Sequence, residues 1–395
     1  MPDPLALIAG WARSAVAPHG GAFRALQPHQ IGAPVLQALL QRAGVPAQAV
    51  DAVVLGNALA AGGNPARMLA LAAGLPQQCA AFSIDTQCCS GIDAVSMAVG
   101  LLASGQASVV IAGGVEAWSR APIRQVRPLC AGEPALAYDR PAFSPDPLRD
   151  PDLLVSAADH AQQHGFSRTQ QDAYAVRSHQ RAMAQANALT AEIVPVAGLT
   201  QDAYPRSIEL RRAARMPVAV KTAGCEDAGR SWGNAGTDCS VSTLAISAKA
   251  DGAALLLLAT PSACKAWGMA PKAAWVSAAS VGGDPGTPLV VAQQAAAAAL
   301  SRIGPTDIAS MRVIELHDAF AVQGLSFCQA FGLVPERINR RGGGLARGHP
   351  IGASGAIAMV RLLSDLQADE APGARGLAAI AGAGGIGTAA IVQRL

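Results

Sequence analysis

The sequence predicts an α/β protein built from two similar halves, with a more polar segment inserted in the first. Strand-like and helix-like patterns alternate from the N-terminus, and a second series of the same kind begins near residue 270. Between them, residues 119–247 contain more Pro, Arg, Asp and Gln. We therefore assign residues 1–118 and 248–269 to the N-terminal half, 119–247 to an inserted loop domain, and 270–395 to the C-terminal half.

Five apolar segments carry the alternation in the first half. We expect strands at residues 5–9, 50–57 and 109–114, and helices at residues 31–43 and 66–73, from the spacing of the apolar side chains. The third strand is apolar throughout, which is typical of a strand buried on both faces of a sheet.

In the insertion and the second half, the spacing of apolar residues again predicts helices and strands. A helical pattern lies inside the insertion, and an apolar strand follows it before the second series of strands and helices. The expected helices are residues 169–187, 292–300 and 356–366, and the expected strands are residues 253–259, 311–316, 378–380 and 389–392.

Composition limits the class of protein. The 395 residues suffice for a large buried core. With 51% hydrophobic and only 14% charged residues, we expect further surface to be covered in a homo-oligomer. A net charge of +3 is too small to indicate nucleic acid binding. One cationic cluster is suited either to a phosphate-bearing cofactor or to a solvated helix face: Arg206, Arg211, Arg212, Arg215 and Lys221.

Targeting and metal signals are missing from the sequence. Residues 1–10 have neither a basic segment nor a cleavage site, and no apolar run reaches membrane-spanning length. The eight cysteines are irregularly spaced, without paired CxxC motifs for zinc. We expect a cytoplasmic protein with reduced thiols, no metal and no membrane contact.

The most informative segment is residues 84–95, which carries Cys88. A β-branched stretch leads into a turn of small residues, and a helical pattern starts at once, with one apolar face formed by Ile92, Val95, Val99 and Leu102. At a helix start, unpaired N–H groups and the helix dipole favour the thiolate, which is the nucleophile. The alternative is a buried structural pair of Cys88 and Cys89, the commoner role of cysteines.

Three further segments offer chemistry. His317 follows a predicted strand, and His349 lies in the glycine-rich segment 342–355, directly before a proline. A lone histidine is more often a structural, hydrogen-bonded imidazole. The glycine loop 382–387 matches GxGxxG literally, but only eight residues follow it and no acidic residue lies about twenty positions on. We therefore prefer a glycine turn that lets substrate approach the backbone to a dinucleotide site.

In this order, these and other segments resemble the thiolase family over nearly the whole chain. Any one of them is a modest signal, whereas the ordered series is highly specific. The matching segments are residues 64–67, 73–76, 84–95, 112–116, 177–182, 192–196, 247, 251–254, 317–321 and 348–355. The resemblance implies a five-layered αβαβα fold, a homodimer or homotetramer, acyl-CoA substrates and no permanently bound cofactor.

The resemblance also implies roles for single residues. Cys88 matches the cysteine that accepts the acyl group, and His349 matches the histidine that activates it. His317 stands where the family has Asn or His to hold a water or the thioester oxygen. Ser247 matches the serine that contacts the pantetheine arm of coenzyme A, although it could simply cap a turn. We expect His317 and turn N–H groups near Gly385 to stabilise the oxyanion.

The chain departs from the family at its second cysteine, which serves as the acid/base. That position is Ala381 here, and the position used by some relatives is Ala319. General acid–base catalysis is typically worth 10²–10⁴-fold. His317 is the obvious substitute, and Cys88, His317 and His349 together are similar to the Cys-His-His set of decarboxylating condensing enzymes.

The chain also departs from the family at Cys89 and in the cysteine-containing segment 224–242. Cys89 stands where the family has glycine and could crowd the pocket or compete as a thiol. The segment 224–242, with Cys225 and Cys239, is longer than usual; it could reshape the acyl pocket or be a solvated insertion.

Three functions are compatible with these residues and with the resemblance. The leading hypothesis is an acyltransferase that moves an acyl group, with acetyl expected, from coenzyme A through a Cys88 thioester, in Claisen condensation or thiolysis of a 3-ketoacyl-CoA. The first alternative is a Cys-His-His condensing enzyme with a decarboxylating extender. The second is a weakened paralogue that binds acyl-CoA or serves as a subunit of an acyltransferase complex.

Overall fold

The structure, a computed structural model, describes residues 6–60, 62–221 and 237–395. Its main sheet consists of an N-terminal and a C-terminal portion, joined where β1 pairs with β12 at Leu7–Ala274 and Ile8–Ala273. In spatial order the N-terminal portion is β4 (Ala80–Ile84), β3 (Ala52–Gly56), β5 (Val109–Ala117), β11 (Ala250–Ala259) and β1 (Leu7–Ser14). The C-terminal portion is β12 (Ala273–Gly282), β15 (Ile386–Arg394), β14 (Arg375–Gly382) and β13 (Val313–Leu316).

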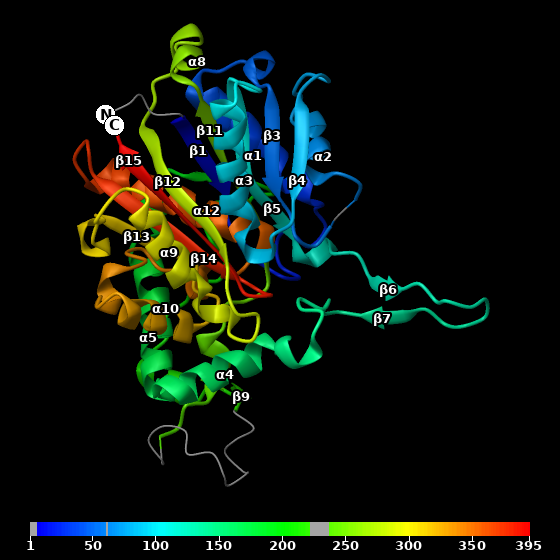
Figure 1. Cartoon of the computed structure of the whole chain (residues 1–395), viewed down its shortest axis with the longest axis vertical. Helices are drawn as coiled ribbons and strands as arrows, with labels where there is room; N and C mark the ends of the chain where they lie inside the picture. The colour runs from blue at the N-terminus through cyan, green and yellow to red at the C-terminus, as the bar shows by residue number, and fades with distance from the viewer. Residues whose placement is uncertain (1–5, 61, 222–236) are drawn as a thin grey trace.

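Helices form three layers around these two sheet portions (Figure 1). The helices α1 (Pro28–Ala43) and α2 (Pro65–Ala72) pack on the outer face of the N-terminal portion. The helices α9 (Val291–Ser301) and α10 (Ala321–Ala330) pack on the outer face of the C-terminal portion. Between the portions lie α3 (Ser90–Ala103) and α12 (Ile351–Asp369), whose apolar side chains contact both sheets in one shared core. The result is a five-layered αβαβα fold, as predicted.

Glycines bring α12 unusually close both to α3 and to the strand β5. A Cβ at Gly91 would lie 2.5 Å from the backbone N of Ala356, and a Cβ at Gly114 would lie 2.0 Å from the carbonyl O of Gly352. Both distances are too short for any side chain, so glycine is required there. This packing sets the start of α12 directly against the start of α3, where Cys88 lies.

The segment 119–247 holds mostly short elements beside the main sheet. The hairpin β6–β7 projects away from the body of the molecule, while α4 and α5 contact α10 (Figure 1). Of the strands described in this segment, β8 alone joins the main sheet, through the parallel pairs Arg13–Ile193 and Ser14–Val194. The elements are β6 (Arg124–Val126), β7 (Leu136–Tyr138), α4 (Leu153–His164), α5 (Arg168–Ala184), α6 (Ala186–Leu189), β8 (Ile193–Val194), α7 (Leu210–Ala213), β9 (Val218–Val220) and β10 (Val241–Ser242).

Short elements complete the chain: β2 (Ala17–Pro18) beside β11, α8 (Pro261–Ala266) after it, and α11 (Gly344–Arg347) before the final helix. Each strand and helix expected from the sequence is present, with ends shifted by a few residues. The strand β12 and the hairpin β6–β7 were not anticipated. The boundaries of the loop domain stay a prediction.

Candidate active site

Cys88 lies in a tight 3₁₀ turn, Gln87–Cys89, between β4 and α3. Gln87 has a positive φ of 48°, which is uncommon for a residue with a side chain. Two hydroxyl groups hold the turn: Ser90 Oγ donates to the carbonyl O of Gln87 at 2.6 Å, and Thr86 Oγ1 donates to Asp93 at 2.6 Å. The sharp bend directs the Cys88 thiol away from the helix axis and towards α12.

His349 comes to this thiol from the turn between α11 and α12. Its N–H donates to the carbonyl O of Ala248 at 2.7 Å, and its own carbonyl accepts from Trp118 Nε1 at 3.0 Å. With the backbone held on both sides, His349 Nε2 lies 3.2 Å from Cys88 Sγ. The structure thus brings together two predicted site residues that are 261 positions apart.

The second ring nitrogen of His349 fixes the tautomer. Nδ1 lies 2.7 Å from Ser354 Oγ, and that hydroxyl donates its only proton to the carbonyl O of Pro350 at 3.0 Å. On this network we assign Ser354 Oγ as the acceptor, which places the ring proton on Nδ1. The Nε2 lone pair then faces the thiol, which is the orientation that a general base needs.

Burial keeps the pair of Cys88 and His349 uncharged. The cysteine retains partial solvent access, yet burial of the thiol raises its pKa to about 12, although backbone N–H groups of Ala383 and Cys88 itself oppose this. Burial also lowers the pKa of His349 to about 4. The N–H groups favour the thiolate, as expected, but desolvation outweighs them. The resting pair is a thiol beside a neutral imidazole.

His317 adds a second imidazole beside this pair. It follows β13, and its ring centroid lies 4.4 Å from that of His349. The residue is 6% exposed, and its Nε2 finds no hydrogen-bond partner among the residues that the structure describes. Burial, and then the nearby His349 and Arg347, hold its pKa well below the usual range. A buried polar atom without a partner is costly, which indicates a place for a substrate oxygen or a water.

Asp318 and Ser247 hold the glycine-rich segment in place. The buried Asp318 carboxylate accepts from Tyr174 Oη at 2.8 Å and from the N–H of Gly344 at 2.5 Å. Ser247 Oγ donates to the carbonyl O of Gly344 at 2.7 Å, and its N–H donates to the carbonyl O of Ala319 at 2.8 Å. Ser247 thus lies next to the histidine segments, with its hydroxyl proton already used inside the protein.

The loop 382–387 is the turn of an antiparallel hairpin between β14 and β15, which excludes the strand–turn–helix geometry of a dinucleotide site. Within this loop, the backbone N–H that is hydrogen-bonded to the Cys88 thiol belongs to Ala383 and not to Gly385. Gly385 serves the turn: its φ is 75°, and a Cβ there would lie 2.7 Å from the backbone of Asp284. The sequence carried no residue-type signal for Ala383, because the donor is a backbone group.

The remaining predicted cysteine features are either packed in the core or outside the described residues. Cys89 is fully buried and its thiol donates to the carbonyl O of Ile380 at 3.7 Å, so it packs in the core and faces away from the pair. Ala381 is 8% exposed and packs in the outer core of the C-terminal portion. Cys239 is buried, whereas Cys225 and the rest of 222–236 lie outside the described residues.

The predicted phosphate-binding cations are spread along one segment. The Arg206 guanidinium stacks on the Tyr204 ring at 4.2 Å, and Arg215 and Lys221 are exposed. Within the described ranges, no hydrogen bond or ion pair joins these cations to Cys88 or the two histidines. In the same ranges, no three His, Cys, Asp or Glu side chains are grouped to hold a metal ion. None of the helices described is long and apolar enough to cross a lipid bilayer.

Comparison with known proteins explains this arrangement. The sequence model of the thiolase N-terminal domain matches residues 6–262, and that of the thiolase C-terminal domain matches residues 269–394. The chain belongs to the thiolase family. Among its relatives, an acetyl-CoA acetyltransferase of Allochromatium vinosum is 35% identical over 391 residues, covering 97% of each chain. An acetyl-CoA acetyltransferase of Rhizobium meliloti is 34% identical over 416 residues, covering 100% of each.

Solved thiolase structures agree along the whole fold. An acetyl-CoA acetyltransferase of Bacillus anthracis superposes with a TM-score of 0.88 at 28% identity, covering 100% of this chain and 99% of that one. The Acat5 thiolase of Ascaris suum, solved in complex with coenzyme A, superposes with a TM-score of 0.87 at 28% identity, covering 99% and 100%.

Proposed function

We propose that this thiolase transfers an acyl group, acetyl in the first instance, from coenzyme A to Cys88 and then to an acceptor. Membership of the family and relatives that are acetyl-CoA acetyltransferases support acyl transfer from coenzyme A. The observation that carries the proposal is the 3.2 Å approach of His349 Nε2 to Cys88 Sγ, with the lone pair facing the thiol.

The first half-reaction needs only this pair. As Cys88 Sγ attacks the thioester carbon, its proton moves to His349 Nε2, and the new S–C bond leaves a negative oxygen. The N–H groups of Cys88 and Ala383, together with His317, are the donors available to that oxygen. Collapse of this tetrahedral intermediate breaks the bond between the carbonyl carbon and the sulfur of coenzyme A, and His349 returns the proton to that sulfur. A neutral resting pair of Cys88 and His349 suits this order of steps, because charge develops only during attack.

The second half-reaction depends on the acceptor. A thiol acceptor reverses the first step and needs no further group. A carbon acceptor must lose a proton, and Ala381 offers no side chain to take it. After the acyl-enzyme has formed, His349 is again neutral and lies 4.4 Å, ring to ring, from the neutral His317. We propose that this imidazole pair provides the acid/base for condensation.

The same imidazole pair favours one second candidate, a condensing enzyme that uses a carboxylated extender. His317 Nε2 has no partner in the described part of the chain, and two neutral imidazoles could hold the thioester oxygen of the extender. Loss of CO₂ from that extender would leave the carbanion without any base. This route needs no acid/base side chain at position 381.

Intact mass spectrometry tests the nucleophile. After incubation with acetyl-CoA, the wild type should gain one acetyl group, Cys88→Ala should gain none, and the matched variant Cys89→Ala should gain one. Labelling that survives Cys88→Ala contradicts the proposal.

Turnover assays separate the two acceptors. Product from acetyl-CoA alone supports the thiolase reaction, whereas turnover only with malonyl-CoA supports the decarboxylating one. If the wild type is acetylated but neither substrate is turned over, the chain acts as a weakened paralogue or as a subunit of a larger acyltransferase.

We also propose that the enzyme is a homodimer or homotetramer. The edge strand β4 has no neighbour on its outer side in the described chain, and it exposes 46% of Phe82. Met68, Leu71 and Met97 on the adjoining helices are also 44–54% exposed. An unpaired strand edge with apolar neighbours is a template for pairing with another copy. Light scattering should give at least a dimer for the wild type and a monomer for Phe82→Glu; a monomeric wild type contradicts the proposal.

Coenzyme A is proposed as a substrate that leaves after each turnover, in a cytoplasmic enzyme. The cysteine pattern without paired motifs supports a reducing compartment. Ser247 lies beside the histidine segments, where a pantetheine arm would enter, and the cations Arg206, Arg215 and Lys221 are candidates for its phosphates. Ser247→Ala and Arg215→Gln should raise the KM for acetyl-CoA with little change in kcat.

A further inference from the structure

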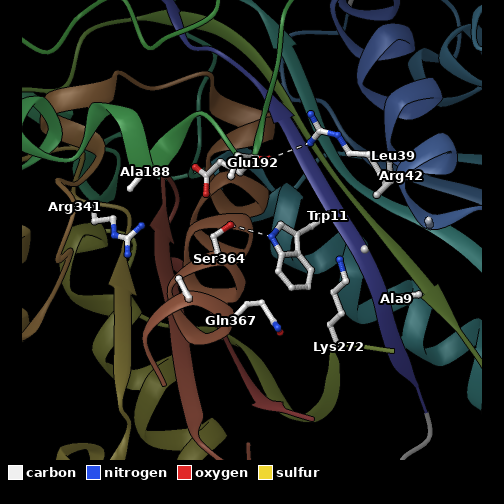
Figure 2. Close-up of a pocket in the computed structure, with 14 residues that line it drawn as sticks. Ala9, Trp11, Leu39, Arg42, Ala188, Glu192, Lys272, Arg341, Ser364 and Gln367 are labelled. Carbon is white, nitrogen blue, oxygen red and sulfur yellow. Dashed lines mark hydrogen bonds between the residues drawn. The ribbon is translucent and has the colours of Figure 1, made fainter. Parts of the chain in front are cut away.

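A pocket of about 280 Å³ lies where the N-terminal half, the inserted segment and the C-terminal half meet (Figure 2). Trp11 of β1 lies at its centre, and Leu39 of α1 and several alanines supply the rest of its apolar lining. Ser364 of α12 accepts from Trp11 Nε1 at 2.9 Å and so fixes the indole ring. Junctions between domains are common places for ligand pockets, and this one combines a rigid aromatic wall with polar groups.

The charged groups at the pocket leave an excess of positive charge. Arg42 donates only to the backbone carbonyls of Ala191 and Ile193, at 3.2 and 3.3 Å, so several of its N–H donors are unused. Lys272 Nζ lies 5.5 Å from the centroid of the Trp11 ring. Neither side chain forms an ion pair with a carboxylate in the described ranges.

The other charged groups that line the pocket are already compensated. Glu192, the lining carboxylate, is bound by Arg13 at 2.6 Å and also by Arg361. Arg341 pairs with Asp365 at 3.2 Å and with Asp369 at 2.8 Å. Arg42 and Lys272 therefore remain as the two lining cations whose charge is not matched.

This pocket is separate from the thiolase site. Ser364 belongs to the last turns of α12, whereas His349 lies just before its first turn. At 1.5 Å per residue, the fifteen positions between them correspond to about 20 Å. The pocket and Cys88 thus lie towards opposite ends of one helix, and a small ligand could not reach both.

We propose that the pocket binds a small organic anion, with its apolar body against Trp11 and Leu39 and its carboxylate or phosphate group at Lys272 and Arg42. A flat or branched hydrocarbon body suits the indole and alanine lining, and the two cations select a negative charge. Such a ligand is distinct from the acyl-CoA substrate, and the proposal does not depend on the acceptor used at Cys88.

Ligand-observed NMR titration tests this, with the enzyme saturated with coenzyme A so that the thiolase site is occupied. The probes are benzoate and phenyl phosphate, with benzyl alcohol as the neutral body and inorganic phosphate as the bare charge. We expect at least one aromatic anion to bind with a Kd of about 1 mM or tighter. Preference for benzoate or for phenyl phosphate then assigns the natural ligand to carboxylates or to phosphates.

Variants locate the binding. Lys272→Gln and Arg42→Gln should each weaken binding about fivefold, as expected for loss of one partly exposed ion pair. Trp11→Leu should weaken it as well, and Lys265→Gln, an exposed lysine on α8, should leave it unchanged. Because Lys272 is exposed, its variant should fold even if the Trp11 variant does not.

Four results would overturn the proposal. These are no binding of either aromatic anion, equal binding of benzyl alcohol or of inorganic phosphate, displacement of the probes by coenzyme A, and unchanged affinity in both cation variants. Acetylation of Cys88 is a separate readout, so failure here and failure of the proposed function can be told apart.

Discussion

The two ends of α12 bury polar groups in opposite ways. At its start, Cys88 and His349 are shielded from water without a charged partner, and burial shifts both pKa values so that the pair is neutral. Towards its end, Arg361 and Asp365 are buried as ions. A reactive, uncharged site therefore lies at the start of α12, and a charged, unreactive one lies along its later turns.

The charged end is an extended network. Arg361 binds Glu192 of the inserted segment, and Glu192 binds Arg13 of β1 at 2.6 Å, which in turn holds Asp202 at 2.7 Å. Burial alone would raise the pKa of Glu192, but the charges of Arg361 and Arg13 lower it to about 2. These contacts tie together three parts of the chain that are far apart in sequence.

The difference shows what decides whether a buried titratable group is reactive. A group that pairs with an opposite charge stays charged and is fixed in place, whereas a group with only a neutral partner keeps a proton that it can exchange. We therefore expect substitutions at the charged end to change mainly stability, and substitutions at the neutral end to change mainly rate.

The largest effect on stability should come from Arg361→Met. Removing Arg361 leaves the buried Glu192 with Arg13 alone and the buried Asp365 with Arg341 alone, and loss of one partner from a buried ion pair typically costs about 3–5 kcal/mol. The matched control is Arg312→Met, whose ion pair with Glu370 is 63% exposed on the arginine side and should contribute at most about 1 kcal/mol. Urea unfolding of both variants measures the difference. Equal stabilities would show that the buried network does not hold the halves together.

At the neutral end, His317→Ala should slow acetylation of Cys88 about 10²–10³-fold, as expected for loss of one oxyanion donor. His179→Leu is the matched control, because His179 is also buried and its ring nitrogens have no hydrogen-bond partner among the described residues, but its ring is tilted against Tyr204 rather than against His349. Stopped-flow acetylation rates compare the two. If the control slows as much as His317→Ala, the loss reflects the fold and not the site.

A smaller change is expected from Ser354→Ala, which acts through His349. Without the hydroxyl, the Nδ1 proton loses its acceptor and the tautomer is no longer fixed, which we expect to cost about tenfold in kcat, or roughly 1.4 kcal/mol. Ser354→Thr keeps the hydroxyl and should restore most of the rate. A purely structural role would instead lower stability in both variants and leave the pH profile of kcat unchanged.

Much of this molecule could be predicted from local patterns, and the misses have physical causes. The apolar spacing of 109–114 and 31–43 specified β5 and α1, and the motifs around Cys88 and His349 predicted their meeting. The strand β12 was missed because its small Ala and Ser residues carry little strand signal. The resting thiol and the network through Arg13 and Glu192 depend on burial and on contacts 179 positions apart, which no local pattern contains.

The smallest expected effect is on the pH profile, and it tests the neutral pair most directly. With the Cys88 pKa raised to about 12 and the His349 pKa lowered to about 4, the thiol and the imidazole keep the same protonation states from about pH 5 to pH 10. The acetylation rate of the wild type should vary by less than about twofold over that range and fall only below it, as His349 takes up a proton. A thiol that has to ionise before it attacks, without proton transfer to His349, would instead lose rate as pH falls through the ordinary range of a thiol near 8 or 9. Single-turnover rates measured across this range separate the two, and a steep rise between pH 6 and pH 9 would contradict attack by a neutral thiol that passes its proton to His349.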